Sequence, residues 1–219
     1  MRLLDRVLLF GGLMKITDKR VHGFGIKDTP EPVTFGHMVD GKWVIKSRCH
    51  MYATWSGMIM RCYYDKSLKV NPSYGGCSVW EGWKYFSAFR SWMETQDYEG
   101  KHLDKDLLVF GNKIYSPDTC IFIPIRINSF LVDSKGRRGD CLLGTWWDTE
   151  RGKYQTQCRN PFTGKKEYLG RYNTQMDAHL AWKTRKHELA CQLADSEYCT
   201  DDRVANALRV RYLRDMTNV

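Results

Sequence analysis

The 219-residue sequence lacks the patterns that are typical of zinc-binding or disulfide-rich domains, of membrane proteins and of repeat proteins. Its eight cysteines never form a CxxC pair, which argues against a zinc ribbon or a disulfide framework. The short apolar run at residues 7–14 is followed by no small-residue cleavage site and is too short to span a bilayer. The sequence also shows no internal repeat and no low-complexity tract. We therefore expect a globular chain that has no membrane partner.

The cysteines are expected to be scattered, reduced thiols. Cys62, Cys77 and Cys120 lie in aromatic or aliphatic runs, where a free cysteine behaves as a small buried hydrophobic residue. A reducing cytoplasm fits this usage best. Residues 1–13 are either a packed or disordered leader or an extension upstream of a natural start at Met14.

The sequence does contain apolar material for a core and an excess of positive charge. Hydrophobic residues make up 42% of the chain and aromatic residues 13%, which is enough for one domain or two small ones. The 34 lysines and arginines outnumber the 25 acidic residues and give a formal net charge of +9. Such a field attracts polyanions, so nucleic acid is the first partner to consider.

The first part of the chain predicts an irregular arm followed by helices. Residues 15–48 are rich in Gly, Pro and charged residues, so an arm that wraps the next unit is placed at residues 1–48. Apolar residues recur at helical spacing over residues 52–61 and again over residues 83–93. Between them, residues 74–77 predict a tight turn into a short strand. The aromatic residues of this segment are interpreted as core.

The middle of the chain predicts a strand, a loop, a second strand and a helix. The alternating run 103–109 ends at a turn, residues 120–123 form the second strand, and Pro124 starts a helix that holds Asn128. The basic segment 134–140 follows as a flexible linker and marks a domain boundary.

After the linker, strand-like runs at residues 142–147, 153–159 and 167–172 are separated by turn sequences and predict an antiparallel three-stranded sheet. Thr174 then caps a long helix, and a last helix spans about residues 201–214. The predicted fold class is therefore α+β, with a ββα unit and flanking helices followed by a three-stranded antiparallel sheet packed on a helix. The predicted domains are residues 1–48, 49–133, 134–140, 141–195 and 196–219.

Short motifs in the middle segment carry a family resemblance. They are Trp-x-x-Met-x-x-Arg-Cys-Tyr at 55–63, Tyr-Gly-Gly-Cys at 74–77, Leu-Asp-Lys-Asp at 103–106, Gly-Asn at 111–112, and Tyr-Ser-Pro-Asp-Thr-Cys-Ile-Phe-Ile-Pro at 115–124. With Asn128, this set resembles the ββα-metal segment and companion features of HNH endonucleases of phages and mobile introns. The resemblance covers about residues 50–131.

The resemblance implies a role for four positions. In this family an Asp and a His on the first strand supply a metal ligand and the general base, an Asn orients the His, and a His or Asn on the helix completes the metal site. Asp104 takes the metal-ligand place, Lys105 the general-base place, Thr119 the orienting place and Asn128 the second-ligand place. The implied cofactor is one Mg²⁺ or Mn²⁺ ion, which oxygen ligands suit. Lys105 and Thr119 depart from the catalytic pattern.

Alternatives remain open at this site. Lysine is a poor base unless its pKa falls, and the neighbouring Asp104 and Asp106 would hold Lys105 protonated. His102, on the same strand face as Asp104, is either a substitute base or a solvated residue at a strand start. Asp106 either joins Asp104 on that face as a two-carboxylate metal site, or both are surface acids of a non-catalytic descendant.

A second resemblance covers about residues 141–190. Leu-Gly-Thr-Trp-Trp at 143–147, Lys-Lys-Glu-Tyr-Leu-Gly-Arg-Tyr at 165–172 and Asp-Ala-x-x-Ala-Trp at 177–182 are similar to the DNA-binding domain of plant ethylene-response factors, which phage endonucleases also carry. That family lays a three-stranded sheet in the major groove. We expect Trp146 and Tyr168 to be core. The implied DNA contacts are Arg137, Arg138, Trp147, Arg151, Lys153, Gln155, Gln157, Arg159, Lys165, Lys166 and Arg171.

Three functions follow as hypotheses. The first is a metal-dependent HNH-type endonuclease that nicks or cleaves double-stranded DNA, as homing endonucleases do. The second is a catalytically inactive protein of the same fold that occupies or regulates DNA. The third is a phage effector that binds a host protein through its basic surface. A phage-encoded chain would act in the cytoplasm of its bacterial host.

Overall fold

A computed structural model describes residues 20–132 and 140–213 of the chain. They fall into two compact units, one comprising residues 20–95 and 113–116 and the other residues 96–112, 117–132 and 140–213. This division differs in position from the predicted boundary at 134–140. Met14, Arg137 and Arg138 lie outside the described residues.

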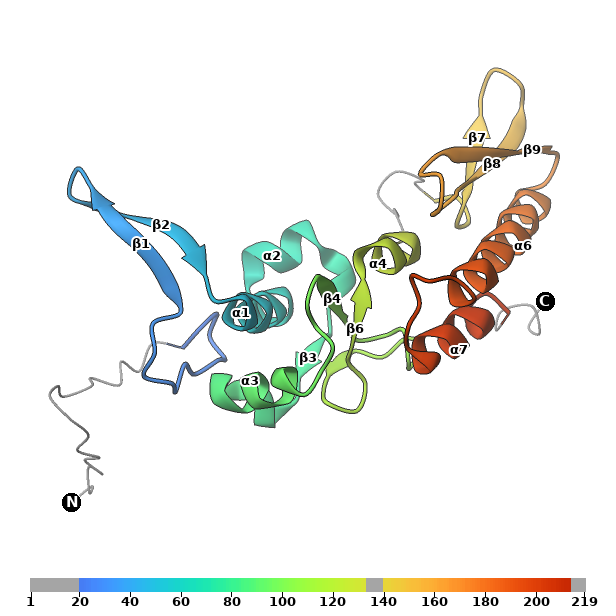
Figure 1. Ribbon diagram of the computed structural model, residues 1–219. Helices are drawn as coiled ribbons and strands as arrows, with labels where there is room; N and C mark the ends of the chain where they lie inside the picture. Colours follow the sequence, from blue (N-terminus) through green and yellow to red (C-terminus); the bar gives the residue numbers. More distant parts are fainter. Residues whose placement is uncertain (1–19, 133–139, 214–219) are drawn as a thin grey trace, which may run out of the picture. The chain divides into compact units, whose positions relative to one another are not determined.

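The first unit is built around α1 (His50–Tyr63) and α3 (Phe86–Glu94), with the short α2 (Asp65–Val70) between them in sequence (Figure 1). Aromatic side chains join the two longer helices. Trp55 and Phe86 lie with their ring centroids 5.5 Å apart, and both side chains are almost completely buried. The indole of Trp55 also donates a 2.7 Å hydrogen bond to the backbone carbonyl of Trp83. The interpretation of the aromatic residues as core is confirmed for Trp55, Trp83, Phe86 and Phe89, whereas Trp80 is 48% exposed.

The two helices predicted for this segment are both present, with one shifted boundary. α3 begins at Phe86, because Glu81–Lys84 form a 3-10 turn before it. The predicted short strand is β3 (Ser78–Val79), which pairs in parallel with β5 (Ile114–Tyr115).

The predicted irregular arm is in part a regular hairpin. β1 (Thr34–Val39) and β2 (Lys42–Arg48) form an antiparallel pair. Asp40 and Gly41 make the turn with φ of 48° and 74°, the left-handed values that a two-residue hairpin turn requires and that Asp-Gly accepts easily. The Gly- and Pro-rich composition obscured this signal.

In the second unit, β4 (Lys101–Asp104) pairs antiparallel with β6 (Ile121–Pro124), and α4 (Ile125–Leu131) follows directly. The predicted order of strand, loop, strand and helix is present. The predicted strand at residues 103–109 is wrong, because β4 ends at Asp104. That this segment of β4, β6 and α4 is an HNH unit stays a prediction.

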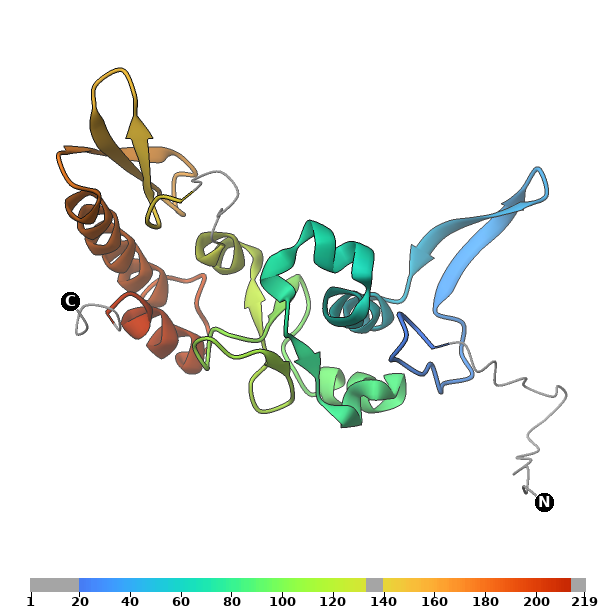
Figure 2. The same ribbon diagram turned by 180° about the vertical axis from the view of Figure 1, so that it is seen from behind.

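The C-terminal part of the second unit holds a three-stranded antiparallel sheet, with β8 (Lys153–Arg159) between β7 (Thr145–Asp148) and β9 (Lys166–Tyr172). Figures 1 and 2 show this sheet beside the N-terminal part of α6 (Gln175–Ala194). The hydroxyl oxygen of Thr174 accepts a 3.1 Å hydrogen bond from the backbone N–H of Asp177, as expected of the predicted cap. The last helix is α7 (Asp202–Arg211). A mixed α+β fold with a three-stranded antiparallel sheet packed on a helix is therefore confirmed.

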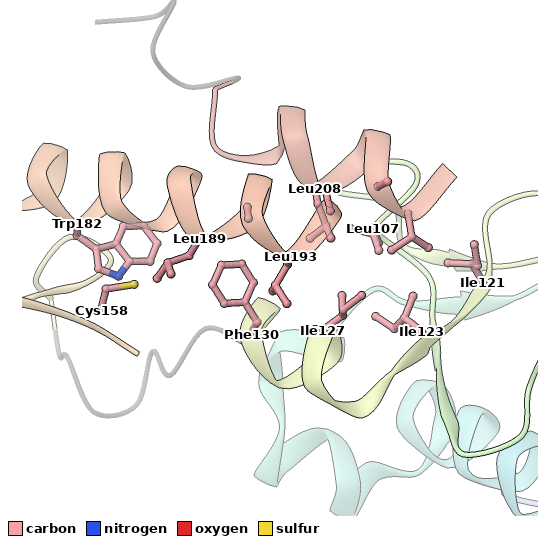
Figure 3. Close-up of a cluster of buried hydrophobic side chains, with 14 residues drawn as sticks. Leu107, Ile121, Ile123, Ile127, Phe130, Cys158, Trp182, Leu189, Leu193 and Leu208 are labelled. Carbon is pink, nitrogen blue, oxygen red and sulfur yellow. The ribbon is translucent and has the colours of Figure 1, made fainter. Parts of the chain in front are cut away.

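One hydrophobic cluster joins the two segments of the second unit (Figure 3). Ile127 and Phe130 of α4 pack with Leu193 of α6 and Leu208 of α7. Lys186 of α6 also donates a 2.5 Å hydrogen bond to the backbone carbonyl of Phe130. The ββα segment and the sheet-plus-helix segment thus share a core rather than each having its own.

All eight cysteines are free in the structure, and Cys62, Cys77, Cys120 and Cys158 are buried. The expectation of scattered thiols outside any disulfide is confirmed. Within residues 20–132 and 140–213, no helix has the length and apolar character needed to cross a membrane.

Candidate functional site

The side chain of Asp104 ends β4 and shapes the turn that follows. Its Oδ1 accepts hydrogen bonds from the backbone N–H groups of Asp106 at 2.9 Å and Leu107 at 2.7 Å. Such a local cap competes with continued strand pairing. Asp106 is consequently not on the strand, and the predicted placement of Asp104 and Asp106 on one strand face is wrong.

Lys105, in the predicted general-base place, is part of an ion pair. It is 8% exposed, and its Nζ lies 2.8 Å from Oδ2 of Asp106. Oδ1 of Asp106 lies 3.7 Å from a guanidinium nitrogen of Arg211. The side chain of Asn112 donates a 2.7 Å hydrogen bond to the backbone carbonyl of Lys105 and fixes the turn. The ammonium group of Lys105 is therefore a member of an ion pair that holds the turn.

Burial, and next the carboxylate of Asp106, raise the pKa of Asp104 above its ordinary value, and the two backbone N–H groups and Arg211 offset this only in part. The raised pKa means that the folded state disfavours the carboxylate, so stability falls as pH rises from the ordinary pKa to the raised one. Asp104→Asn keeps the accepting oxygen without the charge. We expect a higher Tm than wild type at neutral pH and a smaller difference in acid, measured by thermal melts at both pH values. A lower Tm at neutral pH would contradict this.

His102 of β4 and Asn128 of α4 lie in contact with each other. The side-chain amide nitrogen of Asn128 lies 2.9 Å from Nδ1 of His102, and the imidazole is exposed. Thr119, in the predicted orienting place, lies in the turn before β6 and is partly buried. Of the predicted catalytic residues, the structure therefore joins Asp104, Lys105 and Asp106 in one turn and His102 with Asn128 in a separate pair.

These residues, bonded as they are, do not fit a magnesium site. Oδ1 of Asp104 is occupied by two backbone N–H groups, and Asp106 faces the cations of Lys105 and Arg211. Among the residues that the structure describes, no three His, Cys, Asp or Glu side chains are grouped closely enough to hold a metal ion. A hard divalent cation requires several oxygen ligands, so no metal-dependent step is derived from this turn.

The β7–β9 sheet has one covered face and one open face. Strand register places Thr145 opposite Thr156 and Cys158 opposite Glu167. The two threonines and Cys158 are buried, and Glu167 bonds to Arg185 of α6 at 2.7 Å, so this face is covered by the helix. The residues of alternate positions lie on the other face, named here the outer face. It comprises Trp146, Asp148, Lys153, Gln155, Gln157, Arg159, Lys166, Tyr168 and Arg171.

Asp148 is the acidic residue of the outer face, at the end of β7 beside the β7–β8 turn. Its Oδ2 accepts a hydrogen bond from the side-chain amide of Gln155 and lies 3.4 Å from the guanidinium groups of both Arg171 and Arg151. The side chain of Asp148 is only 9% exposed, whereas that of Arg171 is 36% exposed. One carboxylate from β7 thus holds polar side chains of β8, β9 and the β7–β8 turn side by side. Sequence reasoning missed Asp148, because nothing in the pattern marks its partners.

The structure places three aromatic residues of this sheet. Trp147 shares the side of Tyr154, with ring centroids 4.7 Å apart, and is 46% exposed, whereas Trp146 is half-buried and lies on the outer face opposite Gln155. Tyr168 is 57% exposed on the outer face and lies beneath the guanidinium of Arg171, so its assignment to the core is wrong. A one-residue error in register moves a side chain to the other face of a sheet.

The other predicted DNA contacts lie near the outer face. Lys165 is exposed in the turn between β8 and β9, and Arg151 is exposed in the turn between β7 and β8. The described residues of the predicted set therefore lie on or beside the outer face, except for Trp147.

Comparison with known proteins adds no relative to this description. No protein-family model matches the chain, and searches of curated proteins and of solved structures return no significant match.

Proposed function

We propose that the protein binds double-stranded DNA through the outer face of the β7–β9 sheet. One observation carries the proposal: the face directed away from α6 presents Lys153, Arg159 and Lys166 at the ends of β8 and β9, with Gln155 opposite Arg171 between them. A sheet buried on one face needs only a polar surface on the other. A set of cations around ordered amide and guanidinium groups goes beyond that requirement.

The chemistry of these side chains matches duplex DNA. Lysine and arginine at the strand ends neutralise phosphates and release counterions, which supplies affinity without sequence preference. Arginine pairs with the O6 and N7 atoms of guanine, and glutamine with N6 and N7 of adenine, in a major groove that admits a β-sheet. The formal net charge of +9 supports the encounter with DNA.

The test is fluorescence anisotropy with labelled duplexes of random sequence, single strands of the same length, and an acidic protein as a further polyanion. We expect duplex DNA to bind most tightly. Equal binding of all three would mean that only net charge is recognised and would overturn the proposal. Tight binding of the acidic protein alone would favour the host-protein hypothesis.

Asp148→Asn tests the polar cluster that Asp148 forms with Gln155 and Arg171 on the proposed surface. The substitution removes a negative charge from the face that meets phosphates, so affinity for random duplex should rise by roughly threefold. It also removes the carboxylate that orients Gln155 and Arg171, so selection from a random duplex pool should yield a weaker sequence preference than for wild type. Unchanged sequence preference would show that Asp148 does not position the reading residues.

DNA cleavage is a second candidate function, favoured by the contact between His102 and Asn128. This pair holds an exposed imidazole beside the side chain that the HNH resemblance assigns to the site. The assay is incubation of supercoiled plasmid with the protein and Mg²⁺ or Mn²⁺, beside His102→Ala and Asp104→Ala. Nicking by wild type that is lost in both variants would establish the endonuclease. A mobility shift of the plasmid in chelator without nicking in either metal would overturn this second candidate and leave DNA binding as the function.

A further inference from the structure

The β1–β2 hairpin of the first unit exposes an unusual amount of apolar surface. Every residue of β2 is exposed, and Met38 and Trp43 are 60% and 54% exposed. In both views the ribbon extends away from the helices of its own unit (Figures 1 and 2). The large exposed apolar side chains of the hairpin are Phe35, Met38, Val39, Trp43, Val44 and Ile45.

Neither face of the hairpin is covered by the described part of the first unit. Met38 lies opposite Trp43 on one face, and Val44 lies opposite His37 on the other. A two-stranded ribbon is at best marginally stable in water by itself, and a large exposed apolar patch marks a surface that contacts another molecule. The hairpin is therefore an interaction element.

The two edges of the hairpin differ in charge. β1 carries no Lys, Arg, Asp or Glu between Thr34 and Val39. β2 carries the cations Lys42, Lys46 and Arg48 and no acidic residue. Charged side chains, lysine above all, are the usual protection of an edge strand against pairing. The β1 edge lacks this protection, and pairing of β2 with a second β2 would bring like charges together.

We propose that β1 pairs with β1 of a second copy of this chain and forms a four-stranded intermolecular sheet. Because β1 is uncharged, it is compatible with its own copy in an antiparallel pairing about a two-fold axis. Centring the axis on His37 places Phe35 opposite Val39 of the partner copy, twice in the interface. Aromatic and β-branched residues in this arrangement form favourable cross-strand pairs. Centring it on Gly36 would instead place Phe35 opposite His37.

The test is the mass of the full chain in solution, measured by sedimentation equilibrium over a wide concentration range in reducing buffer. We expect a closed dimer, at twice the chain mass of 25.7 kDa. His37→Lys places two cations opposite each other at the centre of the interface and should weaken the dimer roughly tenfold. Ser47→Lys adds the same cation on β2, away from the proposed edge, and should leave the dimer unchanged.

The near-ultraviolet circular dichroism of the buried Trp55 and Trp83 reports whether each variant keeps the fold of its unit. A wild-type chain that stays monomeric at every concentration would overturn the proposal. Equal weakening by His37→Lys and Ser47→Lys would overturn it too, and so would open-ended association in place of a dimer. This inference is independent of DNA binding, because its readout contains no DNA.

Discussion

Replacing Lys153, Arg159 and Lys166 together by glutamine is expected to lower the affinity for duplex DNA roughly hundredfold at physiological salt. All three side chains are exposed at strand ends on the outer face. Each cation that neutralises a phosphate releases counterions, and this gain in entropy is largest at low salt. Removing three such contacts should therefore also reduce the slope of log affinity against log salt by about three.

The measurement is anisotropy of a labelled random duplex at several salt concentrations. The matched control is the triple variant Lys46→Gln, Lys66→Gln and Lys69→Gln, which removes the same net charge from exposed positions of the first unit. We expect only a small effect of the control on either affinity or slope. If both triple variants bind equally weakly, the net charge of the chain and not the sheet is responsible for binding.

Leu193→Ala is expected to destabilise the second unit by about 2–5 kcal/mol, the usual cost of truncating a buried leucine. Leu193 is 0% exposed and lies in the cluster that joins α4, α6 and α7. Because the ββα segment and the sheet-plus-helix segment share this cluster, the substitution should lower the stability of both together. Chemical denaturation followed by tryptophan fluorescence and by hydrogen exchange of β4 and β8 measures the effect.

The shared core also predicts that the second unit unfolds cooperatively. β4 and β8 should lose protection at the same denaturant concentration in wild type and at the same lower concentration in Leu193→Ala. Ala207→Gly, at a partly buried position of α7, provides a control for helix propensity with a cost of about 1 kcal/mol. Independent melting of β4 and β8 would show that the two segments are separate folding units.

Long periodic segments were predictable from the sequence, and positions set by a single side chain were not. The strand at 153–159 and the helix after Thr174 follow directly from alternation and from a capping residue, and both have the predicted bounds or cap. The strand predicted at residues 103–109 extended an alternating pattern beyond Asp104, where β4 ends. The carboxylate of Asp104 ends β4 by bonding to the next backbone N–H groups, and periodicity carries no trace of that bond.

The candidate DNA surface was predictable for β8 and less so for its neighbours. β8 shows clean alternation, so Lys153, Gln155, Gln157 and Arg159 lie on one face as expected. β9 contains a register shift opposite Thr156–Gln157 that changes which residues face outward, and Tyr168 is exposed as a result. A bulge of this kind depends on the pairing of two strands and is not encoded in the pattern of either one.

The catalytic interpretation rested on matching residues to motif positions, and the structure shows how those residues are bonded. Lys105 and Asp106 form an ion pair in a turn, and Asn128 contacts His102. Motif spacing alone does not show whether a side chain is available to bind a metal ion or already forms hydrogen bonds and ion pairs within the protein. The distinction is the reason why DNA binding, rather than cleavage, is the function proposed first.

The most direct test of the central claim is the salt dependence of wild-type binding to a random DNA duplex in the presence of chelator. Binding by the outer face predicts a linear fall of log affinity with log salt, with a slope of about −3 to −6 for three to six phosphate contacts. It also predicts that a competing excess of unlabelled duplex displaces the probe. Absence of binding at low salt, or an affinity that does not change with salt, would contradict DNA recognition by this surface.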